Sequence, residues 1–170
     1  AKIFSEKTKN NGNVFCVEPN EGMFKMGKNK LKFYKNISWH PSPAEKLPFK
    51  DNTFDFYTIG YGIRNVSNIN KCLKEAFRVL KTGGRFMCLE FSKIENELLN
   101  KFYGQYSKII PFIGKRIVGT SKPYEYLVSS IEKFYNQEQL LKLIEDNGFQ
   151  NVEFRNLSNG ISAIHSGWKI

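Results

Sequence analysis

A charged pair, Arg64 and Asn65, follows the most apolar strand pattern of the chain. The run 54–59 is rich in aromatic and β-branched residues, and Gly60-x-Gly62 interrupts it at once. Because ligands of α/β proteins bind beyond the carboxyl ends of the sheet strands, we expect this pair to lie at a site. The guanidinium stays protonated, so Arg64 can stabilise negative charge but is a poor base. A structural arginine that bonds loop carbonyls is the alternative.

Glu18 is a second candidate for binding. The short apolar strand 14–17 ends at this residue, and Pro19-Asn20 then begins a helix. An acid at such a strand end accepts hydrogen bonds from ribose hydroxyls in dinucleotide-binding folds. An exposed acid near a helix N-terminus is also stabilised by the helix dipole without any ligand. Both interpretations remain open on the residues alone.

The histidines and cysteines are too scattered to predict a metal site. His165 has the ordinary pKa range of a general base, but it lies in the last strand, where a structural role is the alternative. His40 has no partner motif. Cys16, Cys72 and Cys88 have apolar neighbours and no CxxC spacing, which indicates buried free thiols.

The formal net charge of +10 is concentrated in residues 1–50, which hold ten lysines and four acidic residues. Three interpretations compete: a solvated face, attraction to anionic lipid, and binding of nucleic acid. Arginine is scarce, and neither an Asn-Pro-Pro-Tyr nor a Pro-Cys motif of nucleic-acid methylation is present. We therefore expect no nucleic-acid partner.

The elements that must position these residues alternate along the chain. A chain of 170 residues, 41% of them hydrophobic, can bury one domain core. We expect helices near 2–9, 19–30, 68–80 and 136–144, and strands near 14–17, 37–39, 55–61, 86–91, 152–157 and 161–168. Such alternation predicts a mainly parallel α/β sheet.

Two helices carry the clearest local signals. The apolar stripe Ile69, Cys72, Leu73, Ala76, Phe77 and Leu80 has helical spacing. Asn136 and Gln139 have the spacing of a capping box. In the helix 19–30 we expect Met23, Phe24, Met26 and Gly27 on or near the inner face.

Several motifs, in this order, resemble the C-methyltransferases of ubiquinone and menaquinone biosynthesis. The specific ones are Gly-Ile-Arg-Asn-Val at 62–66, Tyr-x-Tyr-Leu-x-x-Ser-Ile at 124–131, and the ending 160–169 with its histidine. Leu-Pro-Phe at 47–49 and Val-Leu-Lys-x-Gly-Gly at 79–84 recur in many methyltransferases and indicate only the superfamily.

The resemblance implies a class I methyltransferase (Rossmann-like) fold, three-layered, with an antiparallel last strand and S-adenosylmethionine as cofactor. On the cofactor side it assigns ribose binding to Glu18 and places Pro43 and Ala44 beside the adenine. It also implies that Gly60 lets the cofactor approach the backbone closely.

On the substrate side the resemblance assigns chemistry to Arg64 and Asn65. A hydroquinone ring becomes electron-rich as its hydroxyl loses a proton, and Arg64 would stabilise the resulting phenolate. Tyr124, Tyr126 and His165 would line the substrate site.

The chain departs from the family in two respects, and the smaller is Glu18, where the family more often has Asp. The family's glycine-rich loop, which follows its first strand and cradles the methionine part of the cofactor, is absent from these 170 residues. We therefore expect residues 1–170 to form the C-terminal three-quarters of one methyltransferase domain whose first strand is missing. Residues 93–135 are expected to be an aromatic-rich, substrate-covering insertion.

The resulting hypothesis is S-adenosylmethionine-dependent C-methylation of a prenylated benzoquinol in ubiquinone biosynthesis. A menaquinone-pathway enzyme and a non-catalytic methyltransferase-fold subunit are the alternatives, and a nucleic-acid methyltransferase is less well supported. Expected partners are the prenylated quinol, the membrane periphery, a quinone-synthesis complex and a second copy of the chain. We expect the matrix side of the mitochondrial inner membrane for a eukaryotic protein and the cytoplasm for a bacterial one.

Overall fold

The computed structural model describes residues 1–8, 11–93 and 122–170, apart from the side chains of Pro123 and Tyr124. Its elements, in chain order, are α1 (Lys2–Thr8), β1 (Val14–Val17), α2 (Glu21–Lys30), β2 (Ile37–His40), β3 (Phe54–Gly60), the 3₁₀ turn η2 (Ile63–Asn65), α3 (Ile69–Val79), β4 (Leu80–Phe91), α5 (Lys122–Lys133), α6 (Gln137–Asp146), β5 (Gln150–Leu157), η3 (Ser158–Gly160) and β6 (Ser162–Trp168). In these ranges no helix is long and apolar enough to cross a bilayer.

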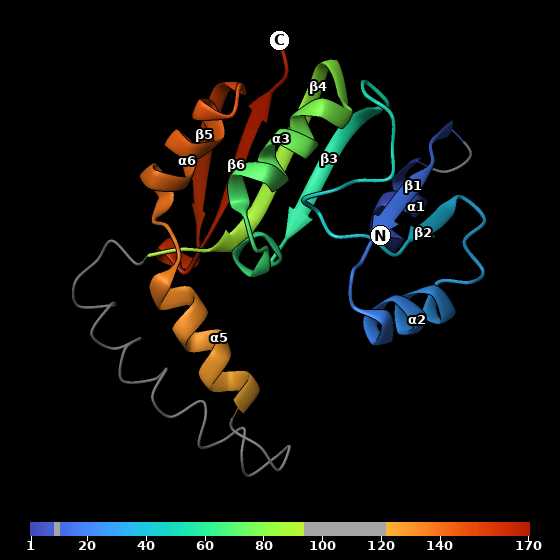
Figure 1. The fold of residues 1–170 in the computed structure, drawn as a ribbon, viewed down its shortest axis with the longest axis horizontal. Coiled ribbons are helices and arrows are strands. Elements are labelled where there is room, and N and C mark those ends of the chain that lie inside the picture. The colour runs from blue at the N-terminus through green and yellow to red at the C-terminus, as the bar shows by residue number, and fades with distance from the viewer. Residues whose placement is uncertain (9–10, 94–121) are drawn as a thin grey trace.

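The strands form two sheets (Figure 1). β1 and β2 pair in parallel, and β3, β4, β6 and β5 form the second sheet in that spatial order. β3 and β4 are parallel, whereas β6 is antiparallel to both β4 and β5, which confirms the predicted last strand. Within the described ranges β1 and β3 share no ladder, so the sheet is interrupted where the sequence predicted the missing first strand.

Aromatic side chains, rather than backbone hydrogen bonds, connect the two sheets. The ring of Phe15 on β1 lies 5.2 Å from that of Phe54 on β3, and Phe49 lies 4.8 Å from Phe54. Edge-on ring pairs of this kind contribute roughly 0.5–1.5 kcal/mol each beyond the area they bury. β1 is therefore held beside β3 by side-chain packing alone.

The core lies between α3, α6 and the four-stranded sheet. Leu73 and Ala76 of α3, Leu140 and Ile144 of α6, and Phe86 of β4 are at most 1% exposed. The predicted stripe of α3 is confirmed, because its members face this core. The capping box predicted at Asn136 and Gln139 is confirmed as well.

Asparagine side chains cap the N-termini of α3 and α6. Asn68 accepts a hydrogen bond from the backbone N–H of Lys71 at 3.0 Å. Asn136 and Gln139 form a complete capping box, each side chain accepting from the other's backbone N–H. Capping of this type stabilises a helix by about 1 kcal/mol.

One prediction about α2 was wrong. Phe24 and Gly27 do face inward: Phe24 lies edge-on to Trp39, and a Cβ on Gly27 would clash with the Trp39 ring. Met23 and Met26, by contrast, are 60% and 71% exposed. Phe24 and Gly27 are the only partly buried residues of α2 and none is fully buried, so both methionines lie on the exposed part of the helix.

The insertion predicted over residues 93–135 falls largely outside the described residues, which include only Lys93 and the part from 122 onward. There α5 projects beyond the ends of β3 and β4 (Figure 1). Lys93 holds its last turn, because Nζ donates hydrogen bonds to the carbonyls of Ile131 at 2.9 Å and Glu132 at 2.6 Å. The carboxyl ends of β3 and β4 and the helix α5 thus converge on one region.

Candidate active site

The turn after β3 is tightly constrained. Tyr61 has a left-handed backbone (φ 53°), which costs a non-glycine residue energy and is common at functional sites. Its N–H donates to the carbonyl of Leu89 on β4 at 2.8 Å. Ile63, the first residue of η2, is fully buried and anchors the turn in the core. These contacts fix the direction in which Arg64 and Asn65 leave the strand end.

Arg64 forms a buried ion pair with Glu90, the penultimate residue of β4. Nη1 of Arg64 donates to Oε1 of Glu90 at 2.7 Å, and the two side chains are 8% and 1% exposed. The carboxylate also accepts from the backbone N–H groups of Phe91 at 2.9 Å and Arg64 at 3.4 Å. Two strand ends are therefore joined through one desolvated charge pair.

Three further contacts hold the Arg64 guanidinium in place. Nη1 also donates to the carbonyl of Tyr61 at 2.8 Å, and Nε approaches Oγ of Ser130 on α5 at 3.4 Å. The guanidinium carbon lies 5.2 Å from the centre of the Phe91 ring. Nη2 donates to no residue in the described part of the chain. The arrangement immobilises Arg64 and, among the residues that the structure describes, leaves the Nη2 donors unpaired, so they could bind a ligand oxygen.

Asn65 and Tyr126 meet across the gap between η2 and α5. The Tyr126 hydroxyl donates to Oδ1 of Asn65 at 3.1 Å, and Nδ2 of Asn65 approaches the Tyr61 carbonyl at 3.5 Å. Tyr126 remains 58% exposed. Tyr124 lies in the first turn of α5, but its side chain is outside the described residues.

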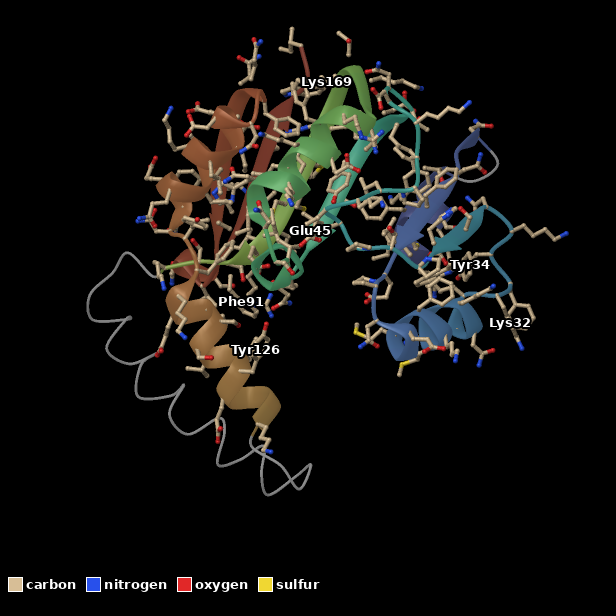
Figure 2. The ribbon with its side chains drawn as sticks, in the orientation of Figure 1. Lys32, Tyr34, Glu45, Phe91, Tyr126 and Lys169 are labelled. Carbon is tan, nitrogen blue, oxygen red and sulfur yellow. The ribbon has the colours of Figure 1, made fainter. Side chains whose placement is uncertain are left out.

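An aromatic surface adjoins this polar cluster. The rings of Tyr61 and Phe91 lie 4.7 Å apart, and the Tyr61 hydroxyl is 3.3 Å from Oγ of Ser162 on β6. Figure 2 shows Phe91 at the end of β4 and Tyr126 on α5 on the same side of the molecule. A flat apolar ring could therefore contact aromatic side chains while one of its oxygens faces Arg64.

Glu18 lies at the end of β1, where its Oε1 accepts a hydrogen bond from the backbone N–H of Asn20 at 2.9 Å. Its own N–H donates to the carbonyl of His40 at 3.2 Å. The second carboxylate oxygen has no partner in the described part of the chain. The side chain is thus oriented at a strand end with acceptor capacity to spare, as a ribose diol requires.

The residues expected beside the adenine lie in the loop before β3. Pro43 is exposed, and its carbonyl accepts from Lys46 N–H at 3.2 Å, whereas Ala44 packs against the core. Glu45 fixes the loop, because Oε1 accepts from the backbone N–H of Ser67 at 2.6 Å (Figure 2). Gly60 has open space where a side chain would begin, which leaves room for a ligand at the strand end.

His165 is set apart from this cluster. It is 1% exposed, its Nε2 lies 2.9 Å from the carbonyl of Gln137, and its ring packs on Phe154. Nε2 must carry the proton, since it faces a carbonyl. Burial lowers the pKa of His165 below its usual value. In this position the side chain is enclosed by α6 and cannot contact a substrate, so the substrate-binding assignment is replaced by a structural role.

The prediction of buried free thiols is confirmed for Cys72 and Cys88, whereas Cys16 is only partly buried because it lies on the short strand β1. Burial raises the pKa of Cys72 to about 11, and it raises that of Cys88 further still. Neither is a nucleophile near neutral pH. In the described ranges no group of three or more His, Cys, Asp or Glu side chains is arranged to hold a metal ion.

Comparison with known proteins decides the family. The model of the ubiE/COQ5 methyltransferase family matches residues 1–169. The chain belongs to this family. It is 50% identical over 161 residues to a mitochondrial 2-methoxy-6-polyprenyl-1,4-benzoquinol methylase of Bos taurus, covering 92% of this chain and 49% of that protein. It is 48% identical over 173 residues to a ubiquinone/menaquinone biosynthesis C-methyltransferase UbiE of Rickettsia akari, covering 98% of this chain and 70% of that protein.

A solved structure confirms the fold of the family. A SAM dependent methyltransferase from Aquifex aeolicus superposes with a TM-score of 0.71 at 19% identity, over 99% of this chain and 75% of its own. The class I methyltransferase fold is thereby established. The chain spans about half the length of the bovine relative.

Sequence reasoning missed two members of the cluster. Glu90 was visible as an acid near the end of the otherwise apolar run 86–91. A carboxylate that is buried in such a run requires a charged or hydrogen-bonding partner. Ser130 stood within the motif 124–131, but only the approach of α5 to η2 reveals its contact with Arg64.

Proposed function

We propose that this protein catalyses S-adenosylmethionine-dependent methylation of a ring carbon of a prenylated benzoquinol in ubiquinone biosynthesis. Membership of the ubiE/COQ5 family and the activities named for its relatives support this proposal. The observation that carries it is the guanidinium of Arg64, immobilised by Glu90 yet left with unpaired donors at the end of β3.

The chemistry requires a stabilised anion. The cofactor supplies a sulfonium-bound methyl group that is open to attack by a nucleophilic carbon. Loss of the quinol hydroxyl proton makes the ring carbon nucleophilic, and Arg64 Nη2 stabilises the oxygen that carries the charge. With the cofactor bound, its methyl group would pass to the ring carbon as the carbon–sulfur bond broke, and the ring proton would then leave to restore the aromatic ring. Asn65 orients the oxygen or a water that accepts a proton.

The residues present fit the adenosine part of the cofactor. Glu18 offers a carboxylate oxygen for a ribose hydroxyl, and Gly60 leaves space beside the backbone. Pro43 lacks a backbone N–H, so Ala44 or a neighbour would supply any backbone donor to the adenine. On the substrate side Tyr126 of α5 and Phe91 of β4 supply the apolar wall, and Tyr124 lies two residues before Tyr126 on α5.

A naphthoquinol of menaquinone biosynthesis is the second candidate substrate, since the name of the Rickettsia relative includes both pathways. The aromatic surface at Tyr61 and Phe91 accepts a one-ring or a two-ring quinol. A non-catalytic role as a methyltransferase-fold subunit would leave the unpaired donors of Arg64 without a purpose.

The expected setting follows from the substrate. A polyprenyl tail places the quinol in a membrane, so we propose peripheral membrane contact, association with a quinone-synthesis complex and self-association as a dimer. The relatives include mitochondrial proteins and proteins of Rickettsia. We propose the matrix side of the inner membrane in a mitochondrion and the cytoplasm in a bacterium.

The test is methyl transfer from S-adenosylmethionine, labelled in its methyl group, to a reduced short-prenyl methoxybenzoquinol, with the product located by mass spectrometry. Label on a ring carbon is expected, and label on an oxygen would contradict the proposal. Glu18→Ala is expected to raise the dissociation constant for the cofactor about tenfold in calorimetry, since one charged hydrogen bond contributes roughly 1.5–3 kcal/mol. Glu21→Ala, on the exposed first turn of α2, is the matched control.

A further inference from the structure

The surface formed by α2 and the segment after it combines exposed apolar side chains with lysines. Met23 and Met26 are 60% and 71% exposed, and Phe33 is 83% exposed, the largest exposure of the large hydrophobic side chains described. Met23, Met26 and Lys30 lie three and four residues apart and share one side of the helix. We call this surface, residues 23–35, the α2 surface.

The exposure of Phe33 is imposed by its neighbours. The hydroxyl of Tyr34 donates to Oε1 of Glu6 at 3.0 Å, and Asn36 Nδ2 donates to the carbonyl of Gly12 at 3.1 Å. The backbone of Tyr34 is also bonded to the carbonyl of Leu31 at 3.0 Å. Because Tyr34 is fixed to α1 and to the C-terminal end of α2, the adjoining Phe33 ring is left on the outside of the protein.

The charge of the α2 surface is almost unopposed. Lys25 forms an ion pair with Glu21 at 2.5 Å, the only acid in the stretch 21–35. Lys28, Lys30, Lys32 and Lys35 are exposed and make no ion pair with any residue in the described ranges. Lys32 Nζ lies 5.1 Å above the Phe33 ring, and Figure 2 shows Lys32 at the outer edge of the molecule.

The α2 surface lies on the side of the molecule where a substrate would arrive. In Figure 1, α2 and α5 both project beyond the ends of the strands that carry Glu18 and Gly60.

We propose that the α2 surface docks the protein on an anionic lipid bilayer, with Phe33 and Met26 entering the interface and the lysines facing the headgroups. Exposed apolar side chains among lysines are the composition by which interfacial segments bind membranes, and each lysine near an anionic surface strengthens binding about fivefold. The inference rests on the proposed function only for its purpose, delivery of a membrane-resident quinol, because lipid binding is measured without methyl transfer.

The experiment is co-sedimentation of the protein with vesicles of phosphatidylcholine, with and without phosphatidylglycerol. Binding is expected only with the anionic lipid and is expected to weaken as salt is added, because salt screens exposed charges. Lys32→Gln with Lys35→Gln should weaken binding about 25-fold. Lys71→Gln with Lys74→Gln, two exposed lysines of α3, removes the same charge and should change binding less than about twofold.

Phe33→Ser separates insertion from charge. It should weaken binding to anionic vesicles even at high salt, where the lysines contribute least. Equal losses in the α2 and α3 variants would overturn the proposal, because net charge alone would then explain binding. Tighter binding to single-stranded RNA than to anionic vesicles at the same salt would overturn it as well. Thermal unfolding of each variant verifies that the fold is retained.

Discussion

The contacts of Arg64 divide into those that hold the side chain and those left for a ligand. Glu90, the Tyr61 carbonyl and Ser130 occupy Nη1 and Nε, whereas Nη2 is unoccupied within the described structure. A buried ion pair contributes little net stability, but removing one member exposes the other to a large desolvation penalty. The ion pair therefore serves to hold the Arg64 guanidinium in place. We infer that it does so for the ligand oxygen that Nη2 is proposed to bind.

The ion pair makes a prediction about stability. Glu90→Leu is expected to lower the free energy of unfolding by roughly 3–5 kcal/mol, since it leaves Arg64 buried without a counter-charge. Adding Arg64→Met should restore most of that loss, because two apolar side chains can pack in the same space. Urea unfolding of both variants measures it. Equal instability of the single and double variants would show that the charges are not coupled.

His165 predicts how stability depends on pH. Burial favours the neutral ring and lowers its folded pKa below the ordinary value of 6.5. The unfolded chain thus binds a proton first, so the stability contributed by neutral His165 is complete above about pH 6.5 and is lost as the pH falls below it. Urea unfolding at about pH 7.5 and about pH 5.5 should show a smaller difference in His165→Gln than in the native protein. An unchanged difference would assign the pH dependence to other groups.

At the scale of elements, the local signals were predictable and the long-range ones were not. The stripe of α3 and the capping box at Asn136 depend on residues a few positions apart, so the sequence contains them completely. The exposure of Met23 and Met26 depends on how few residues of α2 pack against the rest of the protein. The spacing of apolar residues along the helix does not reveal this. Glu90 could not be paired with Arg64, because that contact needs the register of β3 and β4.

The side chain of Lys169 caps the C-terminal end of α3, although the two are far apart in the sequence. Its Nζ donates to the carbonyls of Leu80 at 2.7 Å and Phe77 at 2.9 Å and to Oδ1 of Asn52 at 2.8 Å (Figure 2). A cation at these carbonyls satisfies the open C-terminus of α3.

Replacing Lys169 should lower the free energy of unfolding more than replacing an exposed lysine does. Lys169→Met is expected to lower the free energy of unfolding by about 1–3 kcal/mol, since buried carbonyls lose their donor. Lys142→Met, which removes an exposed ion pair with Asp146, is expected to change the free energy of unfolding far less, because solvent screens that pair. Denaturant unfolding compares the two. Equal losses would mean that Lys169 is an ordinary surface lysine.

At the scale of the whole molecule, the order of motifs predicted the fold class and the antiparallel β6, and the absence of a glycine-rich loop predicted the interrupted sheet. The structure adds the position of α5 relative to the strand ends. Strand ends far apart in sequence meet α5, and this meeting brings Arg64, Asn65 and Tyr126 together. His165, close to them in the motif-based prediction, is separated because alternation along β6 turns its side chain toward α6.

The central claim is that Arg64 stabilises the quinol oxygen during methyl transfer. The most direct measurement is single-turnover methyl transfer by Arg64→Lys, which retains a charge beside Glu90 but loses the second donor arm, with cofactor affinity measured in parallel by calorimetry. We predict a fall in rate of roughly 10²–10³-fold, the effect of removing one oxyanion donor, at nearly unchanged cofactor affinity. Weakened cofactor binding with an undiminished rate of methyl transfer would contradict the account.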